Sequence, residues 1–149
     1  MSTDAKCAKD LLQTLKDGRE GYAKGADELA DSDRPELAET FRRFSAQRQQ
    51  FAAEIRALGA EYGDPVDADG SAAAALHRGW MAVKDAVTGS GPESTLKTAL
   101  QGEDHAVSEY EKSLDEGLSE RFQELVQRQL GEIELARGEI RAALDSTRS

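Results

Sequence analysis

Apolar residues recur along the chain in alternating steps of three and four, the spacing of a helix that buries one face. Four long stripes of this kind run over residues 11–29, 37–62, 96–114 and 118–140, and a narrower one runs over 73–87. Prolines and glycines interrupt the pattern between the stripes, and no alternation typical of a strand occurs. The pattern therefore predicts helices over residues 4–31, 34–62, 71–88, 93–116 and 118–146.

Four long amphipathic helices predict a four-helix bundle. The predicted helix over 71–88 is about 26 Å long, which is enough to travel most of the length of such a bundle. We interpret it as a short helical crossover between the second and third long helices, which then run in the same direction. The expected fold is all-α, a ferritin-like bundle in up-down-down-up order, forming a single domain over residues 1–149.

Polar residues at the inward-facing positions break the apolar stripes. Arg48, Glu103 and Glu132 each lie roughly 14 residues, or ~21 Å of helix, from the same end of the bundle. Gln129 lies close to this level, and Tyr22 offers a phenol from the first helix. Because buried unpaired charges are very costly, Arg48 is expected to pair with Glu103, with Gln129 and Glu132 satisfying the remaining donors.

Several short motifs resemble those of a known family. They are Lys16-Asp17-Gly18 with Gly21-Tyr22, Ala46-Gln47-Arg48 with Phe51-Ala52-Ala53-Glu54, His77-Arg78-Gly79-Trp80, and Gly102-Glu103-Asp104. In these stretches, and over nearly its whole length, the chain resembles the bacterial ferritin-like family called domain of unknown function 2383. It departs from that pattern at Gln101, where a basic residue is expected. The resemblance implies a ferritin-like bundle whose activity is not established.

The same inward positions differ from the ligand pattern of a di-metal site. Ferritin-like di-iron proteins place a Glu on each of two helices and a Glu-x-x-His on each of the other two. This chain keeps Glu103, but it has Gln129 and Glu132 at the i, i+3 spacing and a cation, Arg48, on the second helix. We therefore expect no catalytic residues and no metal or other cofactor, and interpret the chain as a non-enzymatic structural or interaction protein. The alternative is an oxidoreductase or metal-storage protein that holds iron or manganese at Glu103 and Glu132.

The two histidines do not complete a metal site in this interpretation. His105 lies about 200° around the helix from Glu103 and should face away from the core. His77 shares a face of the crossover with Trp80 and Lys84, where an imidazole is more often a packing element than a ligand. These three residues are expected to dock the crossover onto the bundle.

Composition limits the partners and the compartment. The 149 residues include 19 Lys+Arg and 29 Asp+Glu, a formal net charge of −10, so neither nucleic acid nor a membrane surface is an expected partner. The longest apolar run, Ala72 to Leu76, is far shorter than the roughly 20 residues that span a bilayer. The single cysteine, Cys7, cannot form an internal disulfide, and the mixed-charge start has no signal peptide, so we expect a cytoplasmic protein.

A protein partner remains open. One interpretation is a homodimer that acts as a stress-associated binding module, and the oligomeric state is left open. In that interpretation the partner meets either the crossover face or the side of the first helix that carries Gly18, Gly21 and Gly25.

Overall fold

The computed structural model describes residues 2–61 and 91–148, and all regular structure in these ranges is helical. Its helices are α1 (Thr3–Ala30), α2 (Glu36–Glu61), α4 (Pro92–Leu114) and α5 (Glu120–Arg148). Each end lies within two residues of the predicted boundary. The expected helix over 71–88 lies outside the described residues. Among the helices that the structure describes, none has an apolar stretch long enough to cross a membrane.

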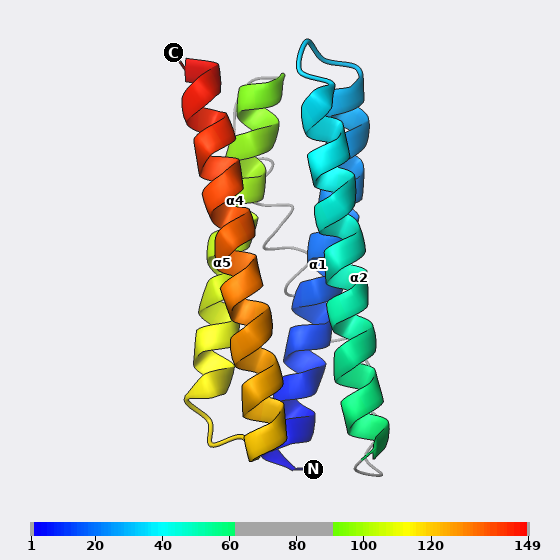
Figure 1. The fold of residues 1–149 in the computed structure, drawn as a ribbon, viewed down its shortest axis with the longest axis vertical. Coiled ribbons are helices and arrows are strands. Elements are labelled where there is room, and N and C mark those ends of the chain that lie inside the picture. The colour runs from blue at the N-terminus through cyan, green and yellow to red at the C-terminus, as the bar shows by residue number, and fades with distance from the viewer. Residues whose placement is uncertain (1, 62–90, 149) are drawn as a thin grey trace.

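The four helices form a bundle in which α1 and α5 run in one direction and α2 and α4 in the other (Figure 1). The end of α2 and the start of α4 lie at opposite ends of the bundle (Figure 1). Around the bundle, α1 packs against α2 and α4, while α5 packs against α4 and, less extensively, against α2. Hence α2 and α4 occupy opposite corners. The all-α, up-down-down-up arrangement of the four long helices is confirmed.

Local signals define several helix ends. The Ser2 side chain accepts a hydrogen bond from the backbone N–H of Ala5 at 3.1 Å and so caps the start of α1. Gly91 precedes α4 with a φ of 98°, and Pro92 occupies the first turn, where a missing N–H does no harm. Gly117, with a φ of 79°, lies between α4 and α5, in the left-handed region that favours glycine. Gly91 and Gly117 lie where the apolar pattern predicted breaks between helices.

The core consists of two apolar clusters that follow one another along the bundle axis. One is built around Leu11, Leu15, Phe51, Ile55, Val107, Phe122, Val126 and Ile133. The other is built around Tyr22, Leu29, Phe41, Phe44, Leu96, Ile140 and Leu144. Arg48 lies on α2 between Phe44 of one cluster and Phe51 of the other. Arg48 and Glu103 of α4, which is also buried, form a charged layer that divides the core.

Two glycines of α1 lie inside this packing. A Cβ added at Gly25 would lie 2.8 Å from the Phe41 ring, and one added at Gly18 would lie 3.5 Å from Nη1 of Arg48. Both glycines therefore face α2. Gly18 and Gly25 are buried against α2 and are not open to a partner, whereas the third glycine of the expected docking side, Gly21, is only half-buried.

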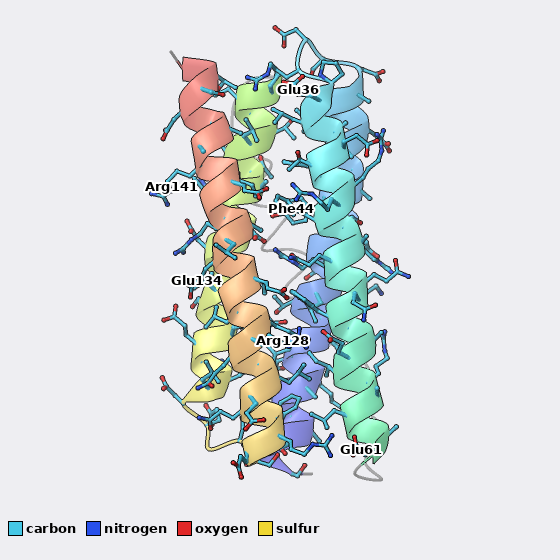
Figure 2. All side chains as sticks on the ribbon, viewed as in Figure 1. Glu36, Phe44, Glu61, Arg128, Glu134 and Arg141 are labelled. Carbon is cyan, nitrogen blue, oxygen red and sulfur yellow. The ribbon has the colours of Figure 1, made fainter. Side chains whose placement is uncertain are left out.

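On the outer face of the bundle, charged side chains predominate. Glu134 and Arg141 point from α5 away from the other helices (Figure 2). Leu135 is the exception among the described residues, a large apolar side chain with 73% of its surface exposed.

Candidate functional site

An ion pair between α2 and α4 fills the centre of the charged layer. Nη1 and Nη2 of Arg48 donate hydrogen bonds of 2.5 and 2.6 Å to the two carboxylate oxygens of Glu103. The side chains are only 2% and 1% exposed. Nε of Arg48 donates to Oε1 of the neighbouring Gln47 at 3.2 Å. Because α2 and α4 are diagonal in the bundle, the pair reaches across its middle.

The electrostatics of the pair favour the charged form of Arg48. Burial would lower the pKa of Arg48, but the adjacent Glu103 carboxylate, through its charge and hydrogen bonds, outweighs this, and the pKa is raised. Charge-assisted bidentate bonds of this kind are among the strongest in proteins. The two opposite charges of the ion pair therefore balance each other within the layer.

Tyr22 of α1 borders the pair through its ring. The guanidinium carbon of Arg48 lies 5.3 Å from the ring centroid, within the range of a cation–π contact. Burial raises the pKa of the Tyr22 phenol, the Glu103 charge adds to this, and Arg48 partly offsets it. The Tyr22 hydroxyl is buried beside the pair without a well-formed hydrogen bond to a described residue, and the face of its ring makes the contact with Arg48.

Gln129 belongs to an adjoining hydrogen-bond network. Its Oε1 accepts from the Tyr110 hydroxyl at 2.8 Å, and its Nε2 donates to the Phe51 carbonyl and to Oε1 of Glu54, both at 3.2 Å. Burial raises the pKa of Tyr110, which therefore remains a donor. Gln129 is fully buried, yet it links α5 to α4 and α2 instead of pairing with Arg48 as expected.

Glu132 does not join the layer, and this expectation is corrected. Its side chain is 46% exposed and lies 3.7 Å from Arg128, also on α5. The reason is helical geometry: four residues after Gln129 the helix places Ile133 in the core, whereas Glu132, one residue earlier, falls at the edge. The carboxylates of Glu103 and Glu132 therefore face different surroundings, one buried and one half-exposed.

The residues of the layer do not fit a di-metal centre. Both oxygens of Glu103 accept hydrogen bonds from a cation, and His105 is exposed. Over residues 2–61 and 91–148, no group of three or more His, Cys, Asp or Glu side chains is arranged to hold a metal ion. A divalent ion at this level would meet the positive charge of Arg48 and its volume.

Some residues of the site were missed by the sequence reasoning. Tyr110 lies seven residues after Glu103 on the same helical face, so the heptad spacing could have identified it. On α1 a further buried pair occurs, in which Nε2 of Gln13 donates to Oδ1 of Asp17 at 2.9 Å. The i, i+4 spacing of Gln13 and Asp17 was the available signal.

Two other groups of candidates have different outcomes. His77, Trp80 and Lys84, the expected docking residues of the crossover, lie outside the described residues. Cys7 is buried, and burial raises the pKa of its thiol, with Ser113 only partly opposing the shift. A buried thiol with a raised pKa is a packing residue and a weak nucleophile.

Comparisons with known proteins agree with this architecture. A family model described as "Domain of unknown function (DUF2383)" matches residues 6–116. No curated protein sequence matches. Among solved structures, a Dps1 mutant from Mycobacterium smegmatis aligns with a TM-score of 0.80 and 17% identity, covering 95% of this chain and 94% of that one. At this level of identity the likeness shows the fold, a ferritin-like four-helix bundle.

Proposed function

Because this chain belongs to the DUF2383 family and has a ferritin-like fold, we propose that it is a non-enzymatic structural or interaction protein. In this proposal an Arg–Glu pair occupies the core of the bundle, where ferritin-like di-iron proteins hold their metals. The pair serves to fix how the helices are assembled, and no reaction takes place there.

One observation carries the proposal: both oxygens of the buried Glu103 carboxylate accept hydrogen bonds from Arg48. A metal would need at least one of these oxygens, so it would break one of the two hydrogen bonds to the buried guanidinium and place a second cation beside the same carboxylate, which is strongly unfavourable. The pair also joins the two diagonal helices directly. Buried polar groups of this kind are known to specify the register of helices in some bundles, which is the role we assign to it.

Metal loading tests the proposal. Purified protein is incubated without oxygen with Fe(II) or Mn(II), desalted and analysed for metal, and oxygen uptake is then followed after adding Fe(II) in air. The expected result is far less than one metal per chain, and oxygen uptake no faster than in buffer. Glu103→Gln should change neither value.

The alternative, iron or manganese held for redox chemistry or storage, predicts the opposite result. Stoichiometric metal that is lost in Glu103→Gln but kept in Glu132→Gln would overturn the proposal. The second variant is a matched control, because Glu132 is half-exposed and lies beside Arg128 at the surface.

The proposal further includes a homodimer in the cytoplasm. The surface feature on which we base this part of the proposal is Leu135 of α5, whose side chain is 73% exposed. Gly131 and Gly138, on the same helix, lie next to open space, so a second chain could approach α5 closely there. Sedimentation equilibrium should give a dimer for the parent protein and a monomer for Leu135→Glu. A monomeric parent protein would contradict the dimer, and recovery in the membrane or extracellular fraction of cells would contradict the location.

A further inference from the structure

The outward face of α5 carries a stripe of small and apolar residues. Gly131, Leu135, Gly138 and Ala142 follow one another in steps of four, three and four, so they share one side of the helix. All four are exposed, and the side chain of Leu135 has 73% of its surface exposed. A Cβ added at either glycine would meet open space. A second helix could therefore approach this stripe closely and cover Leu135.

Two opposite charges lie along one edge of the stripe. Glu134 and Arg141 are seven residues apart, close to two full turns of helix, so they share that edge. Both side chains are exposed and point away from the other helices (Figure 2). Over residues 2–61 and 91–148, neither of them takes part in a hydrogen bond or an ion pair. This edge therefore offers one anion and one cation to a partner.

The other edge of the stripe is different, because its acids already face cations. Glu132 lies 3.7 Å from Arg128, and Glu139 accepts a hydrogen bond of 3.0 Å from Arg43 of α2. These two carboxylates are therefore balanced within their own chain, and they add little repulsion to a contact between copies.

We propose that α5 packs antiparallel against α5 of a second copy of this chain. The two copies are related by a two-fold axis that passes level with the peptide bond between Arg137 and Gly138. The inference rests on the homodimer of the proposed function and assigns the surface through which that dimer forms. A two-fold contact of this kind uses the same patch on both copies.

The spacing along α5 matches this symmetry. In an antiparallel pair of helices about a two-fold axis, each edge of one helix meets the same edge of the other. Glu134 lies three and a half residues before the axis and Arg141 lies three and a half after it, about 5 Å in each direction. Each Glu134 therefore comes level with Arg141 of the other copy, and this contact occurs twice.

The same axis positions the exposed leucine. Leu135 lies two and a half residues before the axis, so it comes level with residue 140 of the other copy, midway between Gly138 and Ala142. A large apolar side chain then fills the space between two small residues, as a knob fills a hole in a coiled coil. A parallel arrangement in register would place Glu134 beside Glu134, so the charges select the antiparallel pair.

Cysteine cross-linking locates the contact. In a chain in which Cys7 is replaced by alanine, Gly138→Cys places two thiols on either side of the axis, offset by only about 1.5 Å along it. Mild oxidation should therefore join the two copies through a disulfide. Gly131→Cys is the matched control, because it is an exposed glycine of the same stripe. Its two thiols would be offset by about 20 Å, so no cross-link should form.

Charge reversal tests the pairing of Glu134 with Arg141. Glu134→Arg places two cations together and Arg141→Glu places two anions together, so each change should raise the dissociation constant of the dimer at least about tenfold. An equimolar mixture of the two variants restores both contacts, and sedimentation should show that heterodimers form. Glu111→Arg, which changes the net charge by the same amount as Glu134→Arg at an exposed position of α4, should leave the dimer unchanged.

The outcomes distinguish this surface from the homodimer itself. A parent protein that sediments as a dimer, but gives no disulfide in Gly138→Cys or gives one in Gly131→Cys, overturns the α5 contact and leaves the homodimer standing. Equal weakening by Glu134→Arg and Glu111→Arg, or a mixture that regains no affinity, overturns the charge pairing. A parent protein that stays monomeric overturns both proposals and leaves a different protein as the occupant of the stripe.

Discussion

Separating the two members of the buried ion pair should be far more damaging than removing both. Arg48→Met leaves the Glu103 carboxylate without its cation, and Glu103→Gln leaves the guanidinium without its anion. With both side chains at most 2% exposed and joined by bonds of 2.5 and 2.6 Å, each single change should lower the free energy of unfolding by about 3–5 kcal/mol. The double variant keeps only a neutral amide at this level and should lie within about 2 kcal/mol of the parent.

Urea or guanidinium denaturation of the four proteins, followed by circular dichroism, measures the coupling. The deficit of the double variant should be at least about 3 kcal/mol smaller than the sum of the two single deficits. The dependence of unfolding free energy on denaturant should be the same in all four, since the buried surface is similar. If a single variant does not fold at all, recovery of helicity in the double variant reports the same compensation.

A surface pair provides the matched control. Nη2 of Arg43 donates to Oε2 of Glu139 at 3.0 Å, and these side chains are 63% and 51% exposed. The cycle of Arg43→Met and Glu139→Gln should give a coupling of no more than about 1 kcal/mol. The reasoning about the buried pair is refuted if its own cycle is additive within about 0.5 kcal/mol, or if its coupling is no larger than that of the control.

Glycine replacement and tyrosine titration test other parts of the packing. Gly18→Ala should stabilise the fold by up to about 1 kcal/mol, because alanine favours a helix and its Cβ has room. Gly25→Ala should destabilise the fold by about 1–3 kcal/mol, because its Cβ would lie 2.8 Å from the Phe41 ring. Equal changes in the free energy of unfolding, measured with denaturant, would contradict this difference. Burial raises the pKa of both Tyr22 and Tyr110, so each should keep its proton in the folded protein near pH ~11, where an unfolded tyrosine has lost it. Stability should therefore fall as the pH rises above about 10, by up to ~1.4 kcal/mol per pH unit for each phenol. In phenolate absorbance, Tyr22→Phe and Tyr110→Phe should leave the titration of the folded protein unchanged, and loss of a titrating group in either variant would argue against its burial.

The fold was predictable from the sequence because the helices are long and their apolar stripes are regular. The breaks at Pro35, Pro92 and Gly117 coincide with the ends of those stripes, so the boundaries of the four described helices fell within two residues. The shared position of Arg48 and Glu103 along the bundle axis followed from counting the residues between each of them and the same end of the bundle. This worked because the rise per residue of a helix is nearly constant.

The partners within the layer were less predictable. Spacing placed Gln129 in the core, but its choice of Tyr110 over Arg48 depends on side-chain rotamers and on distances between helices, which periodicity does not determine. The prediction for Glu132 was wrong for a different reason. Glu132 lies at the edge of the apolar stripe, where a small rotation of the helix decides whether a side chain is buried or exposed.

The central claim is that a guanidinium, and not a metal, neutralises Glu103. Crystals of the protein soaked in Mn²⁺ and measured near the manganese absorption edge test it most directly, because anomalous scattering locates each metal ion. We predict no anomalous peak between α2 and α4, and electron density for the planar guanidinium of Arg48 against both oxygens of Glu103. A peak at the Glu103 carboxylate, with Arg48 turned away, would contradict the claim.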